Sequence, residues 1–278
     1  MKFGWLQSLL LGITTGLTNI LPVSVQAHEQ ILVKFMGKGA VPSLMQLFMH
    51  LGVLAAIFLS CQPHILKMAR AKKMSRIPKR KRKRPLDTRS LMDLRLLTTM
   101  LVPVILMLLV WPRVKLVSSN MIIMATLLFL NGLILYIPQF LPSSNKDCRS
   151  LSRVEGLLMG LGGAMFAIPG LSGMGAALSV ASVTGVDRKY GLNMILLMDM
   201  GILGGKVLYD LLGLIAGDIG TVSPMILLSY LLAAVASFAG AYLAVRILRG
   251  LAESTGYGAF AYYSWGLALF TFVLTLMA

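Results

Sequence analysis

The sequence predicts an all-α integral membrane protein built from two inverted-topology repeats. Of its 278 residues, 57% are hydrophobic and 13% are charged, and the mean hydropathy is +0.80, a balance typical of membrane-embedded chains. Two apolar helical segments are interrupted at a proline, at residues 21–24 and 169–172. Residues 47–56 also match residues 196–205 at a constant offset of 149 residues, which indicates a duplication.

The first repeat is expected at residues 1–141. It begins with a broken-helix hairpin at 5–35, because Pro22 lacks an amide hydrogen and blocks a continuous helix. Apolar stretches long enough to cross a bilayer follow at about 41–61, 96–111 and 120–140. A basic loop at 62–95 separates the first two of these spans and is expected to be the least ordered part of the chain.

The second repeat is expected at residues 142–278, after a short polar linker. Its hairpin covers 151–185, and its spans lie at about 192–215, 224–248 and 258–277. Each half has three spans, about six in all. Because three is an odd number, the second half starts on the opposite side of the membrane from the first, so the two halves are expected to be inverted relative to each other. Two re-entrant hairpins then enter from opposite faces and meet near the middle of the membrane, where such folds place a binding site.

The charge distribution predicts the orientation of the chain. Its formal net charge is +16, and 13 of its 26 lysines and arginines lie between Lys67 and Arg95. Such a cluster beside membrane spans is typical of a cytoplasmic loop and can bind anionic lipid headgroups. No aromatic residues alternate with the basic ones, so nucleic acid is not expected as a partner.

Two segments resemble the signatures of a known family. GLTNILPVSVQAH, at 16–28, resembles the first signature of the bacterial undecaprenyl pyrophosphate phosphatases (the BacA/UppP family), and IPGLSGMGAALS, at 168–179, resembles their second. The resemblance implies a protein of the bacterial plasma membrane that removes phosphate from undecaprenyl pyrophosphate, the lipid carrier of peptidoglycan synthesis, on the outer side. It also implies paired acidic residues, a divalent cation, a serine or histidine, and an arginine on the phosphates.

The chain departs from this pattern at most of the implied catalytic positions. The glutamates of the first signature fall at Thr15 and Asn19, a serine–threonine pair at Val25 and Gln26, a further glutamate at Gln46, a glutamine at His50, and the arginine of the second signature at Gly173. Ser24, His28 and Ser172 remain. A divergent member without most catalytic residues is therefore expected, with no cofactor, and with Mg²⁺ or Ca²⁺ only if phosphatase activity persists.

New charged groups stand near these positions. Asp199, Lys206 and Asp210 are spaced to share one face of an apolar helix. They form either a structural ion pair between helices or a site in which Lys206 replaces the lost cations against phosphate. His50 occupies the position equivalent to Asp199 and is expected to pair with it across the repeat axis. Glu29 is a second new carboxylate, beside His28.

The favoured function is binding, and translocation in the manner of a flippase, of a polyprenyl phosphate or diphosphate by a catalytically degenerate member. The alternative is an active undecaprenyl-diphosphate phosphatase with His28 and Ser24 in catalysis. A third is a structural or regulatory membrane partner, and a homodimer is compatible with each. The expected phosphate site consists of Thr15, Asn19, Ser24, Gln26, His28, Ser172, Gly173 and Lys206, supported by Glu29, Gln46, His50, Asp199 and Asp210, with no metal ligands.

Overall fold

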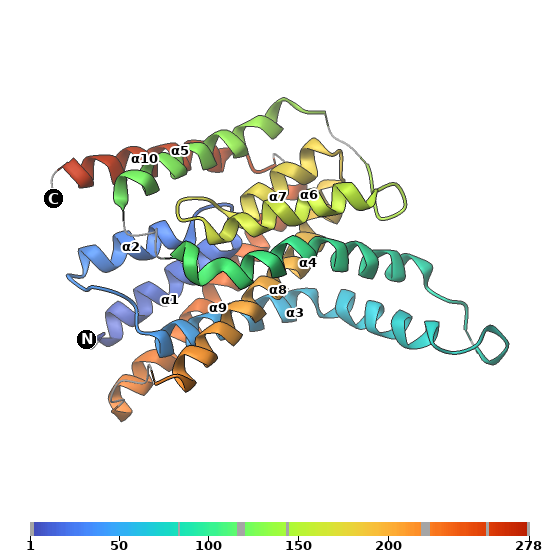
Figure 1. The fold of residues 1–278 in the computed structure, drawn as a ribbon, viewed down its shortest axis with the longest axis horizontal. Helices are drawn as coiled ribbons and strands as arrows, with labels where there is room; N and C mark the ends of the chain where they lie inside the picture. Colours follow the sequence, from blue (N-terminus) through green and yellow to red (C-terminus); the bar gives the residue numbers. More distant parts are fainter. Residues whose placement is uncertain are drawn as a thin grey trace.

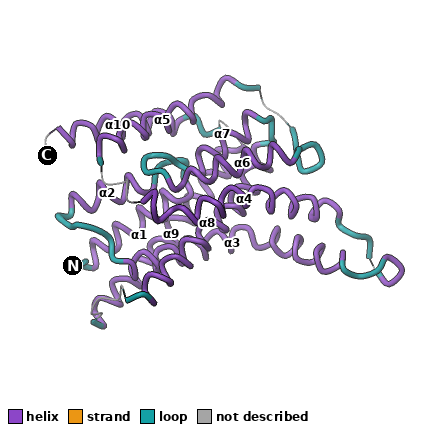
Figure 2. Tube along the Cα trace, viewed as in Figure 1, coloured by secondary structure: helices purple, strands orange, loops and turns teal. Residues whose placement is uncertain are grey.

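The structure is a computed structural model. It describes residues 3–82, 84–115, 120–142, 145–217, 223–253 and 256–276. In these residues the chain forms ten α-helices joined by short loops, with no strand (Figure 2). Lys83 of the basic segment and Met277, at the end of the last expected span, lie outside the described residues.

The first helical segment breaks where the proline predicts. Helix α1 (Trp5–Ile20) ends before Leu21 and Pro22, and α2 (Val25–Phe35) begins after Ser24. Ser24 caps α2, because its side chain accepts a hydrogen bond from the amide of Ala27. Two short helices therefore replace one continuous span.

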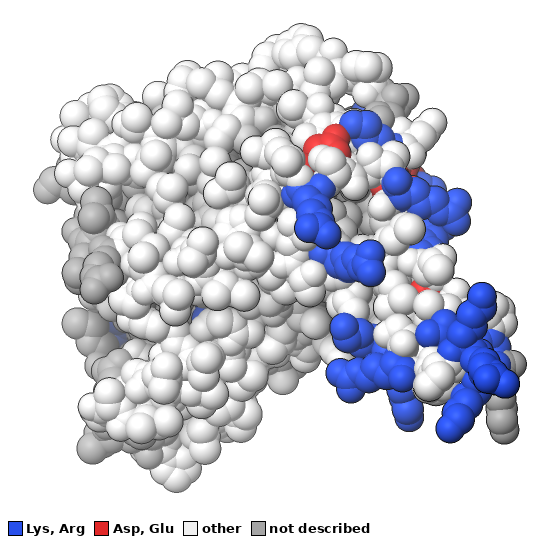
Figure 3. Space-filling view, turned by 45° about the vertical axis from the view of Figure 1, so that its right-hand side comes forward, with Lys and Arg blue, Asp and Glu red and all other residues white. Residues whose placement is uncertain are grey.

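The segment expected as the basic loop 62–95 is instead mostly helical. Helix α3 (Ser43–Ser75) and α4 (Thr88–Lys115) both run through it, and only a short 3₁₀ turn, Lys79–Lys81, lies in the connection. The prediction of a loop was wrong because Lys, Arg, Met and Ala favour helix, so charge density alone did not end α3. The two helices project together beyond the bundle at the end away from both termini, as a basic arm of residues 62–95 (Figure 1). Figure 3 shows lysines and arginines gathered there.

A second broken segment follows the linker. Helix α6 (Arg153–Ala164) begins with a capping box between Ser152 and Glu155. It passes through a 3₁₀ turn, Met165–Ala167, and α7 (Gly173–Val183) begins after Pro169 and Gly170. Gly170 has a φ of +93°, a left-handed conformation that only glycine adopts at little cost.

Four further helices complete the described bundle. They are α5 (Met121–Tyr136), followed by a 3₁₀ turn at Ile137–Phe140, α8 (Arg188–Ile215), α9 (Pro224–Glu253) and α10 (Ala259–Leu276). Helices α5 and α10 lie side by side along one edge of the molecule (Figure 1). Helix α8 packs against α3, so it occupies the interior.

Close helix contact depends on small residues. A side-chain carbon added at Gly12 or Gly16 of α1 would collide with the backbone carbonyl of Ala233 or Ser237 of α9, respectively. Gly52 of α3 meets the same helix at Ala234. Glycine at these points lets α1 and α3 approach α9 more closely than larger residues would allow.

Five described helices are long and apolar enough to cross a bilayer: α3, α4, α5 with its 3₁₀ extension, α9 and α10. About six such spans were expected. Helix α8 has 28 residues and is thus about 42 Å long at 1.5 Å per residue, but its apolar stretch carries Asp199, Lys206 and Asp210. The chain is therefore a multi-pass membrane protein with a charged helix inside the bundle.

Candidate functional site

The two helix breaks contact each other in the interior. The amide of Gly170 donates a hydrogen bond to Ser24 Oγ at 3.1 Å, and Gln26 Nε2 donates to the carbonyl of Phe166 at 3.4 Å. In the second break, Ser172 caps α7 by accepting from the amide of Gly175 at 3.0 Å. The breaks therefore place backbone and side-chain polar groups together at one depth of the bundle.

A small inner cavity of about 20 Å³ lies between the breaks and α8. Among its lining residues are six of the expected site residues: Asn19, Gln26, Ser172, Gly173, Asp199 and Lys206. A side-chain carbon at Gly173 would collide with the carbonyl oxygen of Gly163. The arginine that the family signature implies at this position thus has no room in this backbone arrangement.

A larger cavity of about 510 Å³ opens beside α2 and the start of α3, and we call it the α2–α3 cavity. Its polar and charged lining residues are Gln26, Glu29, Gln30, Lys34, Lys38, Gln46, His50 and Lys206, and its apolar ones include Val25, Val33, Val41, Trp111 and Met121. Gln26 and Lys206 line both cavities, so the two are neighbours. A volume of this size suits a small-molecule headgroup.

Lys206 lies where the two cavities meet. Its ammonium is 5.4 Å from the ring centroid of Phe166 and 5.9 Å from that of Trp111, within the range of cation–π attraction. Asp199, about two turns away on the same face of α8, interacts with it electrostatically. A buried cation between aromatic rings and a carboxylate can bind an anion that enters the cavity.

His50 pairs with Asp210, and the expected pairing with Asp199 was wrong. His50 Nδ1 lies 2.7 Å from Asp210 Oδ2, and the two side chains are 9% and 3% exposed. Asp199 and Asp210 are eleven residues apart on one helix, a separation of about 16 Å. The crossing of α3 over α8 therefore places His50 beside Asp210, although the duplicated sequence aligns His50 with Asp199.

Glu29 reaches the position where the family signature implies a glutamate. The Thr15 hydroxyl donates a hydrogen bond of 2.8 Å to Glu29 Oε1. Thr15 is fully buried, whereas Glu29 lines the α2–α3 cavity. The side-chain Nδ2 of Asn19 donates to the Thr15 carbonyl at 2.8 Å. The carboxylate missing from α1 is thus supplied from α2.

His28 does not line either cavity. Its Nδ1 lies 2.6 Å from the Ser24 carbonyl, and its Nε2 lies 2.6 Å from the hydroxyl of Tyr263. The two rings are stacked, with their centroids 5.7 Å apart. His28 instead lines a separate apolar hollow of about 430 Å³ between α1 and α10. Apart from Ser24, whose carbonyl it contacts, His28 lies away from the other expected site residues.

Sequence reasoning missed several residues of the α2–α3 cavity, among them Gln30, Lys34, Lys38 and Trp111. Lys34 could have been found, because it continues the helical face of Gln26 and Gln30 at four-residue intervals. Lys38 lies in the turn after α2, and Trp111 lies on α4, far away in the sequence. Neither position carries a periodic signal that joins it to the site.

The described residues do not fit the cation site that the resemblance implies. Among them, no group of three or more His, Cys, Asp or Glu side chains is arranged to hold a metal ion. Asp210 is paired with His50, Glu29 accepts a hydrogen bond from Thr15, and Asp199 interacts with Lys206, so the nearby carboxylates are not grouped around one point. A hard cation prefers several carboxylate oxygens around one point, which the described residues do not provide.

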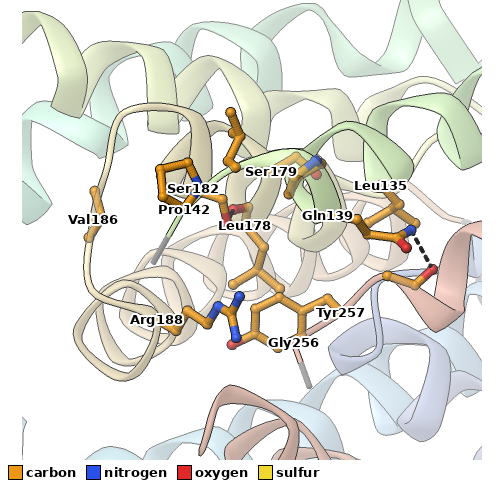
Figure 4. Close-up of a pocket in the computed structure, with 13 residues that line it drawn as sticks. Leu135, Gln139, Pro142, Leu178, Ser179, Ser182, Val186, Arg188, Gly256 and Tyr257 are labelled. Carbon is orange, nitrogen blue, oxygen red and sulfur yellow. Dashed lines mark hydrogen bonds between the residues drawn. The ribbon is translucent and has the colours of Figure 1, made fainter. Parts of the chain in front are cut away.

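A fourth pocket, of about 40 Å³, lies at the other end of the bundle, and Figure 4 shows its lining residues. We call it the Arg188 pocket; it is lined by Gln139, Ser179, Ser182, Arg188 and Tyr257, among others. Met121 of the α2–α3 cavity and Leu135 of this pocket both belong to α5, about 21 Å apart along the helix. The Arg188 pocket is therefore on the side of the basic arm, where Arg89 pairs with Asp147 of the linker.

Comparisons with known proteins agree over nearly the full length. The family model described as "Bacitracin resistance protein BacA" matches residues 8–270. The chain is 28% identical over 274 residues to the undecaprenyl-diphosphatase of Methanobrevibacter smithii, with 96% of each chain covered. It is 28% identical over 271 residues to that of Paenarthrobacter aurescens (97% and 96% covered) and 28% identical over 277 residues to that of Rubrobacter xylanophilus (98% of each).

Proposed function

The chain belongs to the BacA family, and we propose that it removes the terminal phosphate from a polyprenyl diphosphate lipid carrier whose headgroup binds in the α2–α3 cavity. The observation that supports this proposal most directly is that Lys206, Glu29 and His50 all line one cavity of a membrane-embedded bundle. These side chains can bind phosphate and transfer protons. The names of the relatives favour hydrolysis over binding alone.

The cavity chemistry fits a diphosphate with an apolar tail. Lys34, Lys38 and Lys206 supply positive charge at three points of the wall, and Gln46 supplies an amide. Phosphate oxygens accept hydrogen bonds from each of these groups. Val25 and Val33 of α2 and Met121 of α5 give the cavity an apolar wall, which the first units of an isoprenoid chain would contact.

The relocated carboxylate supports catalysis. A chain that had lost both glutamates of its first signature would have no acidic group at this wall. Here the Glu29 carboxylate accepts a hydrogen bond from Thr15, which stands at one of those positions. Loss of the motif glutamates therefore leaves a carboxylate, that of Glu29, in the site, and this group can take part in hydrolysis.

We place the basic arm in the cytoplasm, following the distribution of lysine and arginine beside membrane spans. The α2–α3 cavity lies at the opposite end of the bundle and would then open toward the outside. This is the side on which the family resemblance places the reaction. The fold would consist of two inverted repeats, 1–141 and 142–278, with their re-entrant hairpins meeting at the inner cavity.

The decisive experiment measures phosphate release from undecaprenyl diphosphate by the purified protein, with Mg²⁺, with Ca²⁺ and with EDTA. Lys206→Met, purified in the same way, controls for contaminating phosphatase. We expect release by the wild-type protein and at least a tenfold lower kcat/KM in the variant. Equal release by both preparations, or none by either, contradicts the proposal.

Translocation of a polyprenyl phosphate without hydrolysis is the second candidate. It is favoured by the Arg188 pocket, which contains an arginine (Figure 4) and lies at the end of the bundle opposite the α2–α3 cavity. Inverted repeats with broken helices at mid-membrane are typical of transporters. Vesicles reconstituted with the protein and a fluorescent polyprenyl phosphate test it, and an unchanged rate of transbilayer movement would exclude it.

A further inference from the structure

The His50–Asp210 pair has the geometry of a proton-transfer dyad. Asp210 Oδ2 lies 2.7 Å from His50 Nδ1, and both side chains are buried. An ionised carboxylate only accepts hydrogen bonds, so Nδ1 carries the hydrogen, and in the neutral imidazole Nε2 then presents a lone pair. Nε2 has no hydrogen-bond partner among the described residues. The imidazole is therefore oriented by Asp210 with its basic nitrogen available.

The position of His50 supports the same role. His50 lines the α2–α3 cavity together with Lys206 and Glu29. His28, the histidine that the family signature points to, lies outside this cavity with both ring nitrogens engaged. Of the three histidines in the chain, the third, His64, lies in the basic arm near Asp93. His50 is thus the histidine that can meet a headgroup in the cavity.

We propose that His50 is the general base of the phosphatase reaction and that Asp210 is its positioning residue. This inference rests on the proposed function. A water molecule attacks the terminal phosphorus as the bond from that phosphorus to the bridging oxygen breaks. Nε2 of His50 takes one proton from the attacking water. The bridging oxygen leaves with the polyprenyl monophosphate, orthophosphate is released, and the proton passes from His50 to solvent.

The surrounding charges are compatible with this step. The other charged residues of the cavity that contains His50 are Lys206 on α8, Glu29 and Lys34 on α2, and Lys38 in the turn that follows α2. The lysines offset charge that develops on the phosphate oxygens during attack. Asp210 stabilises the imidazolium that forms when His50 accepts the proton. A pair that only tied α3 to α8 would not need a nitrogen open to the cavity.

The experiment compares wild-type protein, His50→Gln and Asp210→Asn in phosphate release from undecaprenyl diphosphate. We expect His50→Gln to lower kcat by 10²–10⁴-fold, the usual contribution of a general base, with KM within threefold of wild type. The wild-type kcat is expected to fall on acidification, because a protonated imidazole accepts no proton. In His50→Gln this dependence disappears, and Asp210→Asn shifts it. A merely structural tie would leave the shape of the pH profile unchanged.

The matched control is His64→Gln, which alters the other Asp-paired histidine, 3.7 Å from Asp93 and outside the α2–α3 cavity. It should keep wild-type kcat. If glutamine at this position disturbs folding, His50→Ala is assayed with added imidazole instead. Rescue of turnover by imidazole requires a folded site that lacks only the base. Turnover retained in His50→Gln overturns the dyad and leaves the proposed function standing. A wild-type protein that binds the lipid without releasing phosphate overturns both.

Discussion

Replacing Lys206 by methionine tests the phosphate site most directly. The substitution keeps an unbranched side chain between Trp111 and Phe166 but removes the ammonium. Lys206 is 6% exposed, so water screens its charge little. A hydrogen bond to a charged group contributes about 1.5–3 kcal/mol. At about 1.4 kcal/mol per tenfold, the Kd for a polyprenyl phosphate should rise roughly 10–150-fold.

The same substitution leaves Asp199 without the cation with which it interacts. An uncompensated buried carboxylate could repel the phosphate or destabilise the protein. The double variant Lys206→Met/Asp199→Asn separates the two effects. If Lys206 contacts the headgroup, affinity stays low in the double variant, whereas a loss caused by Asp199 alone is reversed.

Titration calorimetry of a short-chain polyprenyl phosphate in detergent micelles gives the Kd for each protein. Lys72→Met is the matched control, because Lys72 is exposed on the basic arm and should not affect the cavity. A Kd for Lys206→Met within twofold of wild type would refute the assignment of Lys206 to the phosphate site.

Three further predictions concern helix packing, the Lys146–Glu155 ion pair and the basic arm. Gly16→Ala places a carbon against the Ser237 carbonyl and should lower the free energy of unfolding by about 1–3 kcal/mol through overpacking. Gly266→Ala is the control, because Gly266 has open space around it. Equal melting temperatures for the two variants would contradict the packing argument. Lys146 and Ser152 hold the pKa of Glu155 at about 2, so its contribution to stability is present above about pH 4.5 and is lost as the pH falls toward 2. Glu155→Gln should lower Tm slightly at pH 7, by an amount that shrinks on acidification, and a difference that grows would be evidence against the pair. Deleting residues 79–84 should weaken association with anionic vesicles while leaving polyprenyl phosphate affinity unchanged, which flotation and calorimetry respectively check.

The helix breaks could be predicted from the sequence because their cause is local. Pro22 and Pro169 each remove an amide donor from an apolar helix, and Ser24 and Ser172 cap the helices that follow. Composition likewise indicates a membrane protein. The basic arm shows the limit of such reasoning, since α3 continues to Ser75 through residues that favour helix despite their charge.

The partners within the site could not be predicted, because they depend on how distant helices cross. His50 and Asp210 are 160 residues apart, and His28 and Tyr263 are 235 apart. Helical periodicity shows that Asp199, Lys206 and Asp210 share a face, but not which of them meets α3. A shift of three turns along α8 changes the partner of His50 and, with it, the chemistry expected of the cavity.

The positive charge of this chain has two physically different parts, and salt distinguishes them. The lysines and arginines of the basic arm are mostly exposed. Dissolved salt therefore screens their attraction to anionic lipids, with a Debye length of about 8–10 Å at 0.1–0.15 M salt. Lys206 is buried between aromatic rings and is screened much less. Raising salt from 0.05 to 0.5 M should therefore release the protein from anionic vesicles that the arm contacts, while the Kd for the headgroup changes little. If both interactions weakened in parallel, the phosphate would have to bind at the exposed arm, and the α2–α3 cavity would lose its role.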